Sequence, residues 1–104
     1  KDAEAIKIAD EAATVSNENQ LNMLGYQMMG VEKYDKAEEY FKLNIKKNPK
    51  SANVYDSMGE CYMAMDNNKE AIKMFQKSLA NNPPPFVKTN SIANLKKLGV
   101  EVEE

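Results

Sequence analysis

The chain has no histidine, no tryptophan and only one cysteine, Cys61, among its 104 residues. A single cysteine cannot form an intrachain disulfide, and without histidine the chain lacks the base that most often activates a nucleophilic thiol or hydroxyl. It also contains no GxSxG elbow, HExxH pair or glycine-rich phosphate loop. We therefore expect no catalytic residue, no metal and no cofactor, and we interpret Cys61 as a small buried hydrophobe.

The sequence likewise lacks an excess of one charge and a long apolar run. Its 14 basic and 16 acidic residues give a net charge of −2, which provides no basic surface for nucleic acid. No apolar stretch approaches the length needed to cross a bilayer, so membrane insertion is not expected. We interpret carboxylates such as Glu38 and Glu39 as solvated charge rather than as metal ligands. The length and the 42% apolar content suit a single domain with one core.

What the sequence does have is a repeat with a period of 34 residues. The pairs that keep this offset are Gly25/Gly59, Ala37/Ala71, Phe41/Phe75, Pro49/Pro83, Asn19/Asn53 and Met29/Met63. A fixed period of this size is typical of stacked helical hairpins, none of which can bury its apolar face alone. The repeat therefore predicts an all-α fold, an α-solenoid of antiparallel helical hairpins.

Within each copy, apolar residues at helical spacing predict two helices. Their faces comprise Leu21, Leu24 and Met28 followed by Ala37, Phe41 and Ile45 in one copy, and Tyr55, Met58 and Tyr62 followed by Ala71, Phe75 and Leu79 in the other. Gly25 and Gly59 allow close approach of a neighbouring helix. We expect Phe41 and Phe75 to anchor the contacts between helices of adjacent hairpins.

The segments outside the two copies predict further helices and set the domain boundaries. Residues 3–15 carry Ala5, Ile8, Ala9 and Ala12 at three- and four-residue spacing, which suits the second helix of a preceding hairpin with a face that a larger protein could cover. The predicted organisation is one domain of about six helices: a half-hairpin at 1–17, repeats at 18–51 and 52–85, a capping helix at 86–99 and a frayed tail at 100–104.

Helix ends carry their own signals. We expect the second helices to begin at capping boxes, formed by Asp35 with Glu38 and by Asn67 with Glu70. Gly99 lies where the last helix should end, in the position that glycine favours after a helix.

The repeat resembles the tetratricopeptide repeat over about residues 18–85. The residues that carry the resemblance are Leu21, Leu24-Gly25, Met28, Ala37, Phe41 and Pro49, and then Tyr55, Met58-Gly59, Tyr62, Ala71, Phe75 and Pro83. The chain departs from the family pattern at Glu32 and Asp66, where the family usually has a glycine at the end of the first helix. It also has Asn44 and Ser78 where a small residue is expected, so we expect wetter hairpin contacts there.

The resemblance implies that the first helices line a concave surface. The residues expected on it are Asn19, Asn22, Tyr26, Met29, Asn53, Asp56, Glu60, Met63, Val87, Asn90 and Asn94. Asparagine can donate to and accept from an extended peptide backbone, and methionine adapts to varied apolar side chains. The pattern favours a peptide-binding groove that is neutral with an acidic patch; the alternative is that these side chains simply face water.

Two kinds of ligand are disfavoured on this surface. Family members that capture a C-terminal carboxylate place lysine and asparagine there, whereas this chain has Asp56, Ser57 and Glu60, so the field has the wrong sign for an anion. A related helical-repeat family that reads RNA needs a basic face, which the mixed or acidic helices here do not offer.

Two hypotheses for the function share this fold. The segment 51–60 and the ending 94–100 resemble short tetratricopeptide segments at the C-termini of some bacterial esterases and serine hydrolases. That resemblance implies a non-catalytic domain packed on a catalytic domain of the parent chain, with the nucleophile upstream of Lys1. The alternative is a free-standing adaptor with a peptide in the asparagine-lined groove. Because the chain begins at Lys1 without a targeting segment, we expect a piece of a longer protein, and localisation and oligomeric state stay open.

Overall fold

The computed structural model describes residues 2–102, apart from the side chains of residues 2 and 5. In this range it contains six α-helices and no strand, which confirms the predicted all-α class and helix number. The helices are α1 (Asp2–Val15), α2 (Glu18–Gly30), α3 (Tyr34–Lys47), α4 (Ala52–Ala64), α5 (Asn68–Ala80) and α6 (Pro85–Lys97). Residues 103–104 of the predicted tail lie outside the described part. None of the described helices is both long and apolar enough to span a membrane.

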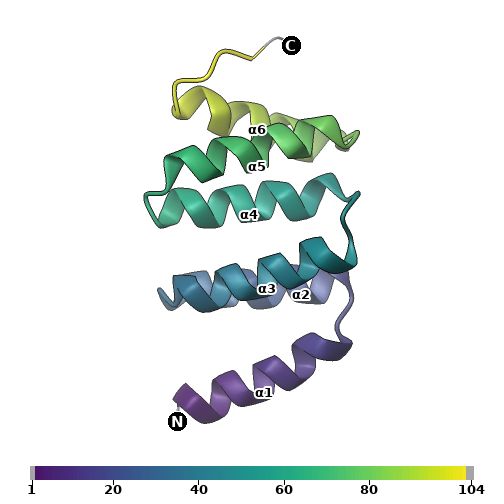
Figure 1. The fold of residues 1–104 in the computed structure, drawn as a ribbon, viewed down its shortest axis with the longest axis vertical. Helices are drawn as coiled ribbons and strands as arrows, with labels where there is room; N and C mark the ends of the chain where they lie inside the picture. The colour runs from purple at the N-terminus through teal and green to yellow at the C-terminus, as the bar shows by residue number, and fades with distance from the viewer. Residues whose placement is uncertain (1, 103–104) are drawn as a thin grey trace.

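The helices are stacked along the long axis of the molecule, with α1 at one end and α6 at the other and with α2 and α3 at the same level (Figure 1). Helices α2 and α3 form one antiparallel hairpin and α4 and α5 form the next, and α3 packs against α4 to join the two. Helix α6 packs against α5 and α4 in the place that the first helix of a further hairpin would take. The predicted hairpin packing is therefore present.

Each hairpin is held by a phenylalanine that packs against a glycine. A Cβ on Gly59 would lie 2.6 Å from the ring of Phe75, and a Cβ on Gly25 would overlap the ring of Phe41 in the same way. Both phenylalanines are fully buried, and Phe41 also meets Tyr26 edge to face. The glycines thus allow the two helices of each hairpin to approach closely, as the repeat predicted.

The ends of the first helices are closed by a backbone motif instead of a glycine. Glu32 and Asp66 both have a φ of 60°, and the following amides of Lys33 and Asn67 donate to the carbonyls of Met28 and Tyr62 at 2.8 Å. This is the Schellman arrangement that glycine normally favours. Gly99, with a φ of 84°, ends α6 in the same way, as predicted.

The predicted capping boxes at the second helices are wrong. Helix α3 begins at Tyr34 after Lys33, and neither α3 nor α5 has a side-chain hydrogen bond at its N-cap. The Schellman closure at Glu32 leads the chain directly into the next helix, so Asp35 already lies inside α3. A capping box that we did not expect forms at the start of α2, where Asn17 and Gln20 bond reciprocally at 2.9 Å.

Helix α1 also packs differently from the prediction. The expected stripe included Ile8 and Ala12, but both are exposed, and the side chain of Ala5 lies outside the described part. The buried contact comes from Ala13, which packs with Leu21 and Tyr40 while Ala9 flanks them. Alanine-rich helices offer several weakly apolar stripes, and the one nearest to the α2–α3 hairpin is buried.

Candidate functional site

The candidate site lies on helices α2, α4 and α6, the first helices of successive units, which contact one another in the order α2–α4–α6. We call it the first-helix face, defined by the ten positions Asn19, Asn22, Tyr26, Met29, Asn53, Asp56, Glu60, Met63, Asn90 and Asn94. Because the sequence repeats every 34 residues, equivalent positions from the three helices lie next to one another across the stack.

A chain of hydrogen bonds runs across this face from α2 to α6. The hydroxyl of Tyr26 donates to Glu60 Oε1 at 2.5 Å, and the amide of Asn90 donates to Glu60 Oε2 and to Asp56 Oδ2, each at 2.7 Å. The hydroxyl of Ser91 lies 2.7 Å from Asp56 Oδ1. We call these five residues the polar ladder; it ties three helices together through side chains.

The polar ladder continues into α5. The hydroxyls of Ser91 and Ser78 lie 2.9 Å apart, and both side chains are fully buried. The position at which we expected a wetter hairpin contact is therefore satisfied by a protein hydroxyl. In the first hairpin the corresponding Asn44 is also fully buried, and its amide donates to the carbonyl of Glu18 at 3.0 Å.

The centre of the ladder is a buried carboxylate whose hydrogen-bond partners in the described part, Asn90 and Ser91, are uncharged. Asp56 is only 5% exposed, and burial raises the pKa of its carboxyl, an effect that the hydrogen bonds from Ser91 and Asn90 partly offset. Burial, followed by the hydrogen bond to Glu60, likewise raises the pKa of Tyr26. The donors that reach Asp56 and Glu60 are hydroxyls and amides, so the two carboxylates keep a negative field on the first-helix face.

The ten positions of the first-helix face, and Val87 that we also expected there, fall into an inner and an outer group. Asp56 and Asn94 are buried, as is Val87, so these three do not present open positions to a ligand. Asn19 is exposed, and Asn53, Met29 and Met63 are half-buried at the margins of the face. Asn22, one period before Asp56, is half-buried with its Oδ1 buried and without a hydrogen-bond partner.

A second polar cluster, which sequence reasoning missed, joins α1 to α3. Asp10 pairs with Lys36 at 2.8 Å and accepts from the hydroxyl of Tyr40 at 2.8 Å. The hydrogen bond from Lys36 lowers the pKa of Asp10, while burial and then Asp10 raise the pKa of Tyr40 to about 12. Lys47 donates to the carbonyls of Thr14 and Ser16 at the end of α1, at 3.1 and 3.3 Å. This cluster fixes α1 on the stack.

Two kinds of reactive site were sought in the described part, a reactive thiol and a metal-ligand cluster. Cys61 is fully buried as expected, and burial raises the pKa of its thiol to about 11, which suppresses the reactive thiolate. Residues 2–102 contain no cluster of three potential metal ligands of the histidine, cysteine or carboxylate type. The site can hold side chains in place and can offer amides, thioethers and negative charge to a partner.

Comparison with known proteins assigns neither a family nor a function to this chain. No protein-family model matches the chain. Among characterised proteins, it is similar to the general transcriptional corepressor trfA of Dictyostelium discoideum, with 35% identity over 54 residues. That region is 52% of this chain but only 4% of the corepressor, so the likeness carries neither family nor function to this chain. The resemblance to the tetratricopeptide segments of bacterial hydrolases stays a prediction.

Proposed function

We propose that the chain is a non-catalytic protein-interaction module whose first-helix face binds an extended peptide segment of a partner. The polar ladder is the observation that carries this proposal. Tyr26, Glu60, Asn90 and Asp56 hold α2, α4 and α6 at fixed spacing before any ligand arrives. A surface that is already ordered loses less conformational entropy on binding, which favours affinity.

The outer residues and the charge of the face define the ligand. The amides of Asn19 and Asn53 can donate to and accept from a peptide backbone, and Met29 and Met63 can adapt to apolar side chains. The uncompensated carboxylates of the ladder disfavour an acidic segment. The expected ligand is therefore an extended peptide that is neutral or cationic and carries apolar side chains.

The partner segment has two possible sources. By its resemblance to the C-terminal segments of bacterial hydrolases, the module would pack on the catalytic domain of its own parent chain; as a free-standing adaptor, it would bind another protein. The size of the native protein distinguishes them. An antibody raised against the chain should detect a polypeptide several times its mass under the first proposal and one of its own mass under the second.

The binding proposal is tested by selecting peptides from a random display library on the immobilised protein. The selected peptides should be neutral or cationic and should bind in solution, as measured by fluorescence anisotropy. A double variant, Asn19→Ala with Asn53→Ala, should weaken that binding at least about tenfold, the loss of about 1.4 kcal/mol expected from two hydrogen bonds.

The matched control is Asn68→Ala, which removes an exposed asparagine from α5, a second helix away from the first-helix face. It should leave the affinity unchanged. Selected peptides that bind the double variant as tightly as the unmodified protein, or a selection dominated by acidic peptides, would contradict the proposed site.

A further inference from the structure

In the described part, three tyrosine hydroxyls donate to carboxylates, and two of these pairs also hold a lysine. The pairs are Tyr40 with Asp10, Tyr62 with Glu38 and Tyr26 with Glu60. Lys36 Nζ lies 2.8 Å from the Asp10 carboxylate, and Lys42 Nζ lies 3.1 Å from that of Glu38. At both places the carboxylate therefore accepts a neutral hydrogen bond and also has its charge compensated by a cation.

The third pair, Tyr26 with Glu60, has the hydroxyl but no lysine. None of the ion pairs within residues 2–102 includes Glu60 or Asp56. The amide of Asn90 donates to both of these carboxylates at 2.7 Å, which places them close together. Because Asp56 is buried, water screens its charge poorly, and the hydroxyls and the amide that donate to the two carboxylates leave their charge uncompensated.

Asn22 adds an acceptor oxygen that lacks a donor. Its Oδ1 is buried and has no hydrogen-bond partner in the described part. Positions 22 and 26 are one helical turn apart, so the side chains of Asn22 and Tyr26 lie on the same side of α2. A buried acceptor without a donor is costly, so this side of α2 favours a ligand that brings hydrogen-bond donors.

Glu60 is the carboxylate of the ladder that a ligand can reach. It is half-buried, whereas Asp56 is only 5% exposed. A carboxylate accepts about two hydrogen bonds on each oxygen, and Tyr26 and Asn90 use one on each oxygen of Glu60. These two donors also hold the carboxylate in one orientation. The group that completes the site must bring donors and positive charge, which an ammonium or a guanidinium group does.

We infer that the partner segment carries a lysine or arginine whose charged group binds Glu60, in the place that Lys42 takes at Glu38. This inference rests on the proposed function and names one residue type of the ligand, whereas the charge of the face alone only disfavours acidic segments. Glu60 then determines the specificity of the first-helix face at this position of the ligand.

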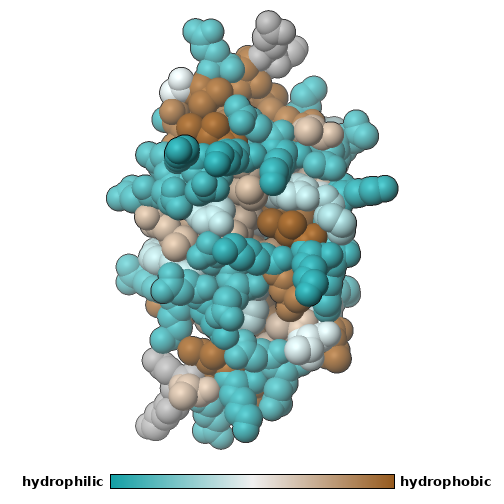
Figure 2. All heavy atoms as spheres, in the orientation of Figure 1, coloured by the Kyte–Doolittle hydropathy of each residue, from teal (hydrophilic) through white to brown (hydrophobic). Residues whose placement is uncertain are grey.

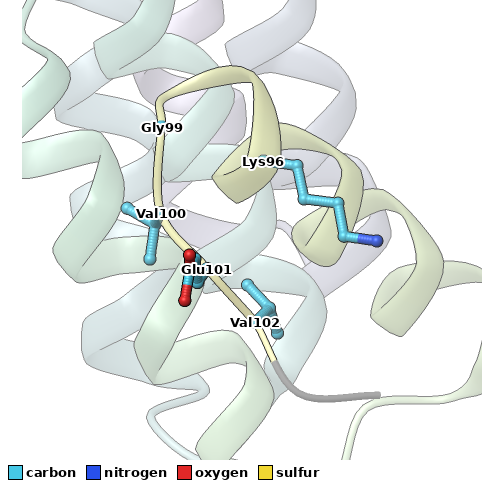
Figure 3. A pocket seen from close by; sticks show the side chains of 5 residues that line it. All are labelled: Lys96, Gly99, Val100, Glu101 and Val102. Carbon is cyan, nitrogen blue, oxygen red and sulfur yellow. The ribbon is translucent and has the colours of Figure 1, made fainter.

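A carboxylate outside the first-helix face provides the matched control. Apolar atoms gather at the α6 end of the molecule in Figure 2, where Glu101 lines a hollow of about 650 Å³ together with Lys96, Gly99, Val100 and Val102 (Figure 3). Val100 and Val102 pack against the core, so the fraying that we expected for the tail does not apply to these two residues. Glu101 itself is exposed, and solvent screens its charge. Glu101→Gln therefore removes one negative charge without touching the first-helix face.

The test uses the peptides selected from the random display library. They should share a lysine or arginine at one position, and replacing that residue by glutamine should weaken binding at least about tenfold in fluorescence anisotropy, as expected when a charge-assisted hydrogen bond is lost. Glu60→Gln, which keeps an acceptor for Tyr26, should weaken binding of the original peptide by the same factor. The glutamine-substituted peptide should bind the Glu60→Gln variant and the unmodified protein alike, because the interaction is already gone. Glu101→Gln should leave the affinity for both peptides unchanged.

Three results overturn this inference while the proposed function stands. The selected peptides depend on Asn19 and Asn53 but share no basic residue; Glu60→Gln weakens the original and the substituted peptide equally; or Glu101→Gln weakens binding as much as Glu60→Gln does. A library that yields no peptide bound at Asn19 and Asn53 overturns the proposed function as well.

Far-ultraviolet circular dichroism should show that both glutamine variants are folded. If Glu60→Gln does not fold, the two peptides are compared on the unmodified protein at low and high salt. The original peptide should bind more tightly than the substituted one at low salt and should lose more affinity at high salt, because salt screens the ion pair. Equal affinities of the two peptides at low salt overturn the inference.

Discussion

Helices α2 and α4 are two copies of the same element, yet the structure buries them very differently. In α2 only Leu21 and Gly25 are buried, whereas α4 buries nine of its thirteen residues. Helix α4 has α2 and α3 on one side and α5 and α6 on the other, while α2 has only α1 beyond it. The repeat sequence therefore determines which residues are in contact within a hairpin. The number of further residues that a first helix buries depends on the neighbouring units.

The same contrast appears at single equivalent positions. Met23 on α2 is 60% exposed, whereas Ser57 and Ser91, one and two periods later, are buried at 1% and 0%. Serine suits a position that the preceding second helix covers closely, and methionine is tolerated on α2, where α1 leaves the position exposed. Each unit thus depends on its nearest neighbours, as expected for a stack of repeats.

The largest loss of stability should come from removing the phenylalanine–glycine contact that is present in each of the two hairpins. Phe41→Ala and Phe75→Ala should each lower the free energy of unfolding by roughly 3–5 kcal/mol, since both side chains are fully buried against a glycine that cannot fill the cavity. Urea denaturation followed by circular dichroism measures this change. Phe86→Ala, in which an exposed ring is removed, should shift the free energy by no more than about 0.5 kcal/mol. An unchanged midpoint for Phe41→Ala would show that the hairpin register is wrong.

Alanine substitution should cost less stability than at the phenylalanines, and it should cost more at Asp56 than at Asn22, the equivalent residue one period earlier. Asp56→Ala removes the acceptor for Ser91 and Asn90 at a buried site and should cost about 1–3 kcal/mol of unfolding free energy. Asn22→Ala should change it by no more than about 0.5 kcal/mol, because the Asn22 Oδ1 has no hydrogen bond to lose. Equal costs for the two variants would mean that the burial difference between α2 and α4 does not govern the stability of this position.

The sequence predicted contacts that depend on local spacing, but it did not predict the hydrogen bonds of the polar ladder. The six helices, the close helix approach at Gly25 and the end of α6 at Gly99 follow from local spacing and residue type, and all three are confirmed. We expected Phe41 and Phe75 to anchor contacts between adjacent hairpins, whereas each ring packs on the glycine of its own hairpin. Asp56 and Glu60 look like solvent-facing polar residues on a helix wheel. Their hydrogen bonds arise only because α6 places Asn90 and Ser91 beside them, which is a tertiary contact.

A signal for the ladder was nevertheless present across the repeats. Read one period apart, Asn22, Asp56 and Asn90 alternate amide, carboxylate and amide, so donors and acceptors face each other between adjacent first helices. The face of α1 had no such signal, because alanine and isoleucine occur on several sides of that helix. The face of α1 that packs on the stack is the one that carries Asp10, whose partners Lys36 and Tyr40 belong to α3.

The smallest expected effect concerns the left-handed residues that end the two first helices. Glu32 and Asp66 hold the same φ of 60°, but aspartate tolerates this conformation better than glutamate. Glu32→Gly should therefore raise the free energy of unfolding by about 1 kcal/mol, and Asp66→Gly should raise it less, because glycine relieves the steric cost of a Cβ at positive φ. Thermal melts of the two variants measure the difference. Gly99→Ala, which introduces a Cβ at a φ of 84°, should shift the melting temperature downward instead. If Asp66→Gly stabilised the protein more than Glu32→Gly, the tighter packing around α4, and not side-chain tolerance, would control the cost at these helix ends.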